Sequence, residues 1–187
     1  KAERAGEPPV EPLYTVDDAK GAASCFRPCR YGECVTIADG LRVRFSDIGH
    51  LLGSACIEFW LREGGTEKKI VFSGDVGNID QPILNDPLPV AETDYLVVES
   101  TYGNRLHDKP KDVRAELTEV LQRAFDRGGS VIIPAFAVGR TQELLYLLRE
   151  IKQKKLVHGH DGFPVYLDSP LAEEATSVFL QCDTDCF

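Results

Sequence analysis

The sequence lacks any long hydrophobic segment. None of the apolar runs in its 187 residues approaches the roughly 20 residues that a transmembrane helix needs. The chain also opens without the basic and apolar pattern of a signal peptide. These absences argue against a membrane-spanning or secreted protein, and we expect a soluble, cytoplasmic one. With 43% hydrophobic and 27% charged residues, the composition is typical of a globular protein that buries a sizeable core.

Methionine is absent, and the chain begins at Lys1. Because translation starts with methionine, we interpret the sequence as an excised piece of a longer protein. The last helix-like stretch also ends without a clear cap near Phe187, so we interpret the C-terminal end as cut as well.

Cysteine occurs six times but never in the spacing of a zinc ribbon. Cys25, Cys29 and Cys34 follow the spacing C-x3-C-x4-C, and Cys182 and Cys186 follow C-x3-C. A zinc ribbon repeats the pair C-x2-C instead. We therefore expect reduced thiols in a cytosolic protein rather than a thiolate metal site.

Positive charge is scarce. Lysine and arginine number 21 against 30 acidic residues, so the net charge is −9. This balance argues against extensive nucleic-acid binding, because phosphate affinity comes largely from basic side chains. Bound metal ions would reverse the argument locally, since each dication is a large positive charge. The one compact basic stretch, Lys152–Lys155, is interpreted as a solvated helix end.

Glycine and proline divide the first half of the chain into short elements. Residues 1–13 contain three prolines and predict an extended arm. The sequence Thr15-Val-Asp-Asp18 predicts a helix start, and the helix reaches about Phe26. Asp39-Gly40 and Gly64-Gly65 are typical hairpin turns. Around these turns, short apolar runs predict strands at 35–37, 41–45, 55–61 and 69–72.

In the second half the hydrophobic period alternates between strand and helix. Apolar residues at helical spacing predict helices at 112–125, 140–151 and 171–180. Short apolar runs predict strands at 95–98, 131–133 and 165–167, and we expect the strand at 131–133 to be buried. This order predicts an α/β arrangement in which crossover helices connect the strands.

His50 and Asp75 are the side chains that best fit a metal site. Each follows an apolar strand and lies beside glycine, which allows the tight turn that aims a side chain into a cleft. Imidazole and carboxylate groups are the ligands of metals that hydrolyse phosphodiesters. Taken singly, however, a histidine or aspartate in such a place is more often a turn or cap residue.

Three motifs in this order carry a family resemblance. They are Gly49-His-Leu-Leu-Gly-Ser-Ala55, Phe72-Ser-Gly-Asp75 and Glu99-Ser-Thr-Tyr-Gly103. Together they resemble the β-CASP branch of the metallo-β-lactamase-fold nucleases, of the RNase J and mRNA 3′-end cleavage endonuclease type. The resemblance extends from about Leu13 to Leu180, which is most of the chain.

The resemblance implies an α/β fold with parts of two domains. Residues 14–110 would form the C-terminal part of a metallo-β-lactamase-like αββα sandwich. Residues 111–187 would form the start of a β-CASP α/β domain, with a soft boundary. The stretches 133–143 and 165–172 also resemble the β-CASP module, and both read as junctions between a strand and a helix, where α/β proteins bind ligands.

The resemblance also implies roles for single residues at a site with two zinc ions. His50 would ligate one ion, and Asp75 would bridge both and thereby take part in catalysis. Glu99 would orient a ligand histidine without touching zinc, although a carboxylate at a strand end can simply cap the next turn. Arg140 and Ser169 are candidates for substrate binding, although an arginine at a helix start more often pairs with a carboxylate.

Several parts of the family pattern are absent, among them the later β-CASP histidines and the closing metal-ligand histidine. The family's His-x-His-x-Asp-His cluster should precede His50, yet His50 is the first histidine in the sequence. His107, His158 and His160 lie in predicted loops and are interpreted as surface residues. Because catalytic zinc usually has three protein ligands per ion, we expect this chain alone to be inactive and at best weakly metal-binding.

The function that the resemblance implies is a fragment of a zinc-dependent ribonuclease. The expected partners are an RNA substrate and the remainder of the parent chain, with a homodimer left open and no membrane. A first alternative is another metallo-hydrolase of the same fold, such as a thioesterase, against which the β-CASP-like second half counts. A second alternative is a non-catalytic scaffold in RNA processing.

Overall fold

The computed structural model describes residues 11–106 and 112–182. The chain divides into two compact units, residues 1–30 and residues 31–187, and each is described by itself. The predicted domain boundary near residue 110 falls among residues outside the described ranges, and so does most of the predicted arm 1–13. That division into domains therefore stays a prediction.

The first unit contains the helix α2 (Val16–Ser24). The Thr15 hydroxyl accepts a hydrogen bond from the Asp18 N–H at 3.3 Å, and the Asp18 carboxylate accepts one from the Thr15 N–H at 2.8 Å. This reciprocal pair satisfies two main-chain donors that a helix start otherwise leaves open. The predicted helix start is confirmed.

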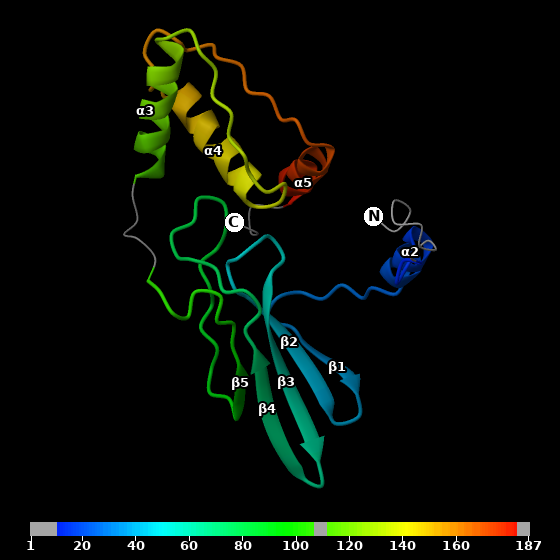
Figure 1. The fold of residues 1–187 in the computed structure, drawn as a ribbon. Coiled ribbons are helices and arrows are strands. Elements are labelled where there is room, and N and C mark those ends of the chain that lie inside the picture. Colours follow the sequence, from blue (N-terminus) through cyan, green and yellow to red (C-terminus); the bar gives the residue numbers. More distant parts are fainter. Residues whose placement is uncertain (1–10, 107–111, 183–187) are drawn as a thin grey trace, which may run out of the picture. The chain divides into compact units, whose positions relative to one another are not determined.

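The second unit contains a five-stranded sheet in the order β1-β2-β3-β4-β5 (Figure 1). The first four strands pair as antiparallel neighbours, and β5 runs parallel to β4. The strands predicted at 35–37, 41–45, 55–61, 69–72 and 95–98 are confirmed, with longer bounds for the first four. The observed strands are β1 (Cys34–Ala38), β2 (Leu41–Asp47), β3 (Ala55–Glu63), β4 (Thr66–Phe72) and β5 (Tyr95–Val97).

Glycine turns set the register of this sheet. Gly64 and Gly65 have φ angles of 55° and 83° and form the two-residue connection between β3 and β4. A two-residue hairpin turn of this kind needs positive φ at both positions, which glycine adopts without steric cost. Gly40, with φ of 72°, makes the turn between β1 and β2. The predicted hairpins are therefore confirmed.

One buried charge lies in the centre of the sheet. Glu58 on β3 is only 1% exposed, and its carboxylate accepts hydrogen bonds from Arg44 at 2.9 Å and Ser46 at 3.1 Å. Lys69 on β4 lies 2.7 Å from the same carboxylate. Burial alone would raise the pKa of Glu58, but the hydrogen bonds from Arg44, Lys69 and Ser46 outweigh it and lower that pKa to about 2.

Three helices follow the sheet in the chain: α3 (Val113–Phe125), α4 (Arg140–Gln153) and α5 (Pro170–Gln181). Asp112 begins α3 by accepting a hydrogen bond from the Ala115 N–H at 3.0 Å. Ser169 begins α5 in the same way with the Ala172 N–H at 3.2 Å, and Pro170 occupies the first turn. Each cap satisfies one of the main-chain donors left open at the start of α3 and of α5. The three predicted helices are confirmed.

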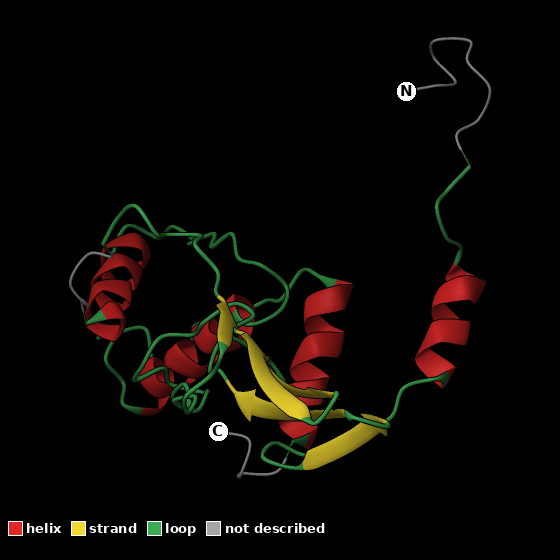
Figure 2. Ribbon diagram, turned by 90° about the horizontal axis from the view of Figure 1, so that it is seen from below, coloured by secondary structure: helices red, strands yellow, loops and turns green. Residues whose placement is uncertain are grey.

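Two predicted strands are wrong. Residues 131–133 and 165–167 belong to no strand and run as connections between helices, drawn in green in Figure 2. Ile132 is 92% exposed, so the expected burial of 131–133 is also wrong. Apolar residues form strands where a neighbouring strand pairs with their main chain. Within the described ranges, no segment forms such a ladder with either stretch.

The second unit has two separate hydrophobic clusters. Ile48, Cys56 and Val71 form one at the end of the sheet where the candidate site lies, with Val90 packed against it. The other joins α3 and α4 to the residues after α4: Leu121, Leu148, Ile151 and Val157. Burial in the first cluster raises the pKa of the Cys56 thiol and so favours its protonated form. None of the described helices combines the length and apolar character of a membrane span.

Candidate functional site

His50 lies in a loop directly after β2 whose shape is set by local hydrogen bonds. The Gly49 N–H donates to the Asp47 carboxylate at 2.9 Å, and Gly49 has a positive φ of 66°. The N–H groups of His50 and Leu51 both donate to the Ser54 hydroxyl at 3.1 Å. Ser54 in turn donates its own N–H to the Leu51 carbonyl at 2.9 Å. One serine therefore closes the loop that presents His50.

The His50 loop is packed against two other loops at glycines. A Cβ atom on Gly49 would lie 2.7 Å from the Asn85 carbonyl oxygen and 2.9 Å from Pro87 Cδ. Gly77 donates its N–H to the Ile48 carbonyl at 2.8 Å, and a Cβ on Gly77 would overlap the Gly49 carbonyl. Only glycine permits such close approach of two main chains. The loop that follows Asp75 is thereby held directly against the loop that carries His50.

Asp75 follows β4 through a buried serine. Ser73 is 7% exposed and extends the pairing with β5 by donating its N–H to the Val97 carbonyl at 2.9 Å. Its hydroxyl donates to the Gly74 carbonyl at 2.6 Å and accepts the Glu99 N–H at 3.0 Å. Ser73 thus links the end of β4 to the residues after β5. Ser73 belongs to the motif Phe72-Ser-Gly-Asp75, but the motif did not predict that this serine would link the two strand ends.

The Glu99 carboxylate holds the main chain next to Asp75. One oxygen accepts the Val76 N–H at 2.6 Å, and the other accepts the Thr101 hydroxyl at 2.6 Å. The Thr101 hydroxyl and the Val76 N–H, with a smaller contribution from the charge of His50, lower the pKa of Glu99 below its usual value. Glu99 is therefore ionised near neutral pH. The predicted role of orienting a ligand histidine stays a prediction.

These loops bring His50 and Asp75 together. The distance from His50 Nε2 to Asp75 Oδ2 is 3.9 Å, and the two side chains are 43% and 72% exposed. Two donors on one tetrahedral zinc ion would be about 3.4 Å apart, given metal–ligand distances of about 2.0–2.1 Å. The pair is thus close to the spacing that a shared ion needs, and it faces solvent, where an ion and a substrate can enter.

The described residues do not complete a zinc site. Across residues 11–106 and 112–182, no group of three or more histidine, cysteine, aspartate or glutamate side chains could hold a metal ion. Catalytic zinc usually takes three protein ligands, and this pair supplies two. His50 and Asp75 as metal ligands therefore stay a prediction, and the donors among the described residues do not by themselves fit the binuclear centre.

Arg140 and Ser169 both have local roles at helix starts. The Arg140 guanidinium donates to the Glu143 carboxylate one turn later at 2.6 Å and is 60% exposed. Ser169 caps α5 through the Ala172 N–H. Both contacts are the ordinary ones for such positions, and the predicted substrate-binding roles stay predictions.

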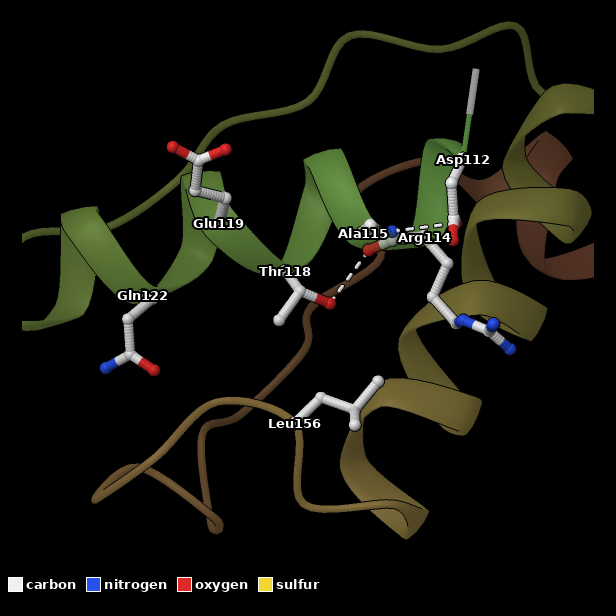
Figure 3. A pocket seen from close by; sticks show the side chains of 7 residues that line it. All are labelled: Asp112, Arg114, Ala115, Thr118, Glu119, Gln122 and Leu156. Carbon is white, nitrogen blue, oxygen red and sulfur yellow. Dashed lines mark hydrogen bonds between the residues drawn. The ribbon is translucent and has the colours of Figure 1, made fainter. Parts of the chain in front are cut away.

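A surface pocket of about 470 Å³ lies elsewhere, along α3 (Figure 3). None of the predicted site residues lines it; its lining consists of Asp112, Arg114, Ala115, Thr118, Glu119, Gln122 and Leu156. Several of its polar groups are already engaged: Asp112 caps the helix, Thr118 donates to the Arg114 carbonyl, and Arg114 donates to Glu150 on α4. We therefore assign no function to this pocket.

Comparison with known proteins gives the class of this fold. Residues 141–186 match the model of the Beta-Casp domain. Over 90% of its length the chain is 36% identical to "Ribonuclease TTHA0252" of Thermus thermophilus, and over 89% it is 34% identical to an "RNase J-like protein" of Methanocaldococcus jannaschii. Over 95% it is 30% identical to "Endoribonuclease YSH1" of Eremothecium gossypii. The chain spans 37%, 38% and 23% of these three relatives.

The mixed α/β fold and these matches define a protein of the metallo-β-lactamase-fold class. Within that class, the chain belongs to the β-CASP family, as its three motifs indicated. The predicted fold class and family are therefore confirmed.

Proposed function

We propose that the protein containing this chain is a metal-dependent ribonuclease that hydrolyses phosphodiester bonds of RNA. The observation that carries the proposal is the approach of His50 Nε2 to Asp75 Oδ2 within 3.9 Å at the ends of β2 and β4. The names of the relatives, which are ribonucleases, support the choice of RNA as substrate.

In this proposal two zinc ions are the cofactors, His50 and Asp75 bind them, and the remainder of the parent protein supplies the other ligands. Glu99 and Ser73 would keep Asp75 in place through the main chain. Bound dications would also offset the net charge of −9 at the point where a phosphate has to approach. Residues 1–187 alone would then be inactive and bind zinc weakly, because two ligands do not fix a catalytic ion.

The proposal is tested by measuring cleavage of 5′-labelled RNA by the full-length protein. Loss of a residue that merely supports a metal ligand costs about 10–100-fold, so His50→Ala and Asp75→Ala should lower the rate by at least about 100-fold. His158→Ala and Asp39→Ala are matched controls on exposed turns outside the site, and both should keep the wild-type rate. Full cleavage by both site variants would contradict the proposal.

The same assay separates the enzyme from the scaffold. A wild-type protein that binds RNA but leaves it intact, even with added zinc, would favour the non-catalytic alternative. A wild-type protein that hydrolyses a thioester but not RNA would favour the thioesterase.

A further inference from the structure

Three loops leave the sheet at the end where the candidate site lies. The strands β2, β4 and β5 run in the same direction, because β3 is antiparallel to β2 and β4, and β5 is parallel to β4. The loops that follow these strands, residues 48–54, 73–94 and 98–106, therefore begin at one end of the sheet. In that order they carry His50, Asp75 and Glu99.

Arg105 is the one lysine or arginine in these three loops. The other formally charged residues of the loops are all acidic: Asp75, Asp80, Asp86, Glu92, Asp94 and Glu99. A phosphate group that approaches this end of the sheet is repelled by those carboxylates and attracted by Arg105. The position of this single cation therefore matters for any RNA chain that reaches the site.

Two successive turns place Arg105 over the ring of Tyr102. The Gly103 N–H donates to the Ser100 carbonyl at 3.0 Å, and the Arg105 N–H donates to the Tyr102 carbonyl at 3.1 Å. The guanidinium carbon of Arg105 lies 4.2 Å from the centre of the Tyr102 ring, and both residues are exposed. A guanidinium within about 6 Å of a ring centre is attracted to the face of the ring. The stack therefore restrains the guanidinium and leaves it at the surface.

The donors of Arg105 are not taken up by a carboxylate. Within residues 11–106 and 112–182, no carboxylate forms a hydrogen bond or ion pair with its guanidinium. Other arginines do have such partners: Arg42, Arg44, Arg62, Arg114, Arg123 and Arg140. The planar fork of an arginine matches a phosphate as well as a carboxylate. Arg105 therefore presents a fork that a phosphate can fill.

Glu99 ties the turn of Arg105 to the site. The Thr101 hydroxyl donates to the Glu99 carboxylate at 2.6 Å. The same carboxylate accepts the N–H of Val76, the residue after Asp75, at 2.6 Å. Tyr102 follows Thr101 directly, so the stack of Arg105 on Tyr102 is held beside the residues that carry the predicted chemistry.

We propose that Arg105 is a substrate-binding residue that holds a phosphate of the RNA chain beside the bond that is cleaved, and that Tyr102 keeps its guanidinium in place. The inference rests on the proposed function, in which the substrate is RNA. It deepens that function by assigning a contact with the RNA backbone. A phosphate contact positions the chain without reading its sequence.

The test measures binding of a fluorescently labelled single-stranded oligouridylate to the full-length protein by anisotropy, in a chelating buffer that prevents metal-dependent cleavage. Arg105→Ala should weaken binding about tenfold, because it removes a hydrogen bond between two charged groups. It should also make the plot of log affinity against log salt concentration shallower by about 0.7, the contribution of one phosphate contact on a single strand.

Arg149→Ala is the matched control. Arg149 also stacks on a tyrosine, with its guanidinium carbon 5.1 Å from the centre of the Tyr146 ring, but it lies on α4 and outside the three loops. The variant should keep the wild-type affinity and salt dependence.

Variants of Tyr102 separate the stack from the charge. Tyr102→Phe keeps the face of the ring and should bind RNA as the wild type does. Tyr102→Ala releases the guanidinium and should weaken binding, although less than Arg105→Ala because the charge remains. In cleavage assays with metal, Arg105→Ala should raise KM and leave kcat nearly unchanged, the pattern of a contact that is equally strong in the ground state and the transition state.

Each outcome decides the inference. Wild-type RNA affinity in Arg105→Ala, equal losses in Arg105→Ala and Arg149→Ala, or a lower affinity with an unchanged salt dependence would overturn it. Equal losses in Tyr102→Phe and Tyr102→Ala would overturn the role of the ring. A wild-type protein that cleaves RNA while Arg105→Ala binds it normally rejects this inference alone, whereas a wild-type protein that neither binds nor cleaves RNA rejects the proposed function.

Discussion

At the scale of single residues, the candidate site is organised by side chains that bond to the main chain of their neighbours. Ser54 bonds the His50 loop, Ser73 joins β4 to the residues after β5, and Glu99 bonds the residue after Asp75. Such groups align a ligand without touching a metal, and their loss typically weakens metal binding. The positions of His50 and Asp75 therefore depend on neighbours that carry no metal chemistry of their own.

Replacing Glu99 tests this dependence. Glu99→Ala leaves the Val76 N–H without its acceptor, and we expect zinc affinity in the full-length protein to fall about 10–100-fold. Glu99→Gln keeps one acceptor oxygen and should lose less. Glu92→Ala removes an exposed carboxylate before β5 and serves as the control. Zinc titration with a competing chelator gives the affinities. A wild-type zinc affinity in Glu99→Ala would show that Glu99 merely caps its turn.

Gly77 gives a second prediction at this scale. The Cβ of Gly77→Ala would overlap the Gly49 carbonyl, and overpacking of this kind costs about 1–3 kcal/mol. Urea denaturation should show a loss of stability in that range. Gly162→Ala is the matched control because nothing lies within 4 Å of the added Cβ. Equal urea midpoints for the two variants would contradict this prediction, because the loops of Gly49 and Gly77 could then move apart without loss of stability.

The buried Glu58 predicts a dependence of stability on pH. Its pKa is lowered from 4.5 to about 2 in the folded protein. Because the folded protein favours the ionised form, this contribution to stability is fully present above pH 4.5 and is lost as the pH falls towards 2. Glu58→Gln should cost about 3 kcal/mol at pH 7, because Arg44 and Lys69 then lack their buried partner.

The measurement is the free energy of unfolding of wild type and Glu58→Gln between pH 7 and pH 2.5. The difference between them should narrow below pH 4.5. Glu67→Gln is the control, since Glu67 is 34% exposed and pairs with Arg42 and Arg62 nearer the surface. Exposed pairs contribute about 0–1 kcal/mol, so that variant should change little. A constant difference across the pH range would contradict the account of Glu58.

At the scale of elements, local sequence patterns predicted the features that form within a single short segment. Thr15 and Asp18 predicted the start of α2, and Gly64-Gly65 predicted the turn between β3 and β4, because caps and tight turns form within a few residues. Residues 131–133 and 165–167 failed as strands because pairing depends on a neighbour far along the chain. Apolar composition alone does not supply that neighbour.

The cap of α5 gives the prediction at this scale. Ser169→Ala removes the hydroxyl that accepts the Ala172 N–H and should cost about 1 kcal/mol. Ser177→Ala, in the middle of the same helix, should be neutral or slightly stabilising, because alanine has the higher helix propensity. Thermal unfolding measures both. If Ser169 also binds substrate, RNA cleavage by Ser169→Ala will fall more than its stability explains.

At the scale of the whole molecule, the motifs predicted the family but not the way in which the site is supported. His50, Asp75 and Glu99 were predicted as site residues because each stands in a characteristic run of neighbours. Glu58 and Gln142 were not found, because a glutamate in a strand and a glutamine in a helix give no sign of burial. Their roles arise only from pairing across β2, β3 and β4 and from packing between α4 and α5.

The chain spans only part of the length of the relatives that it matches. It spans 37% of the ribonuclease of Thermus thermophilus, and its described residues place two candidate metal donors side by side rather than three or more. The central claim is that these two donors belong to a metal centre in the full-length protein.

The most direct test of that claim is the zinc content of the full-length protein, measured by elemental analysis after dialysis. We predict about two zinc ions per chain, the number in a two-metal hydrolytic site, and a marked loss in both His50→Ala and Asp75→Ala. Zinc absent from the wild type under metal-replete conditions, or retained in full by both variants, would contradict the account and leave His50 and Asp75 as turn residues.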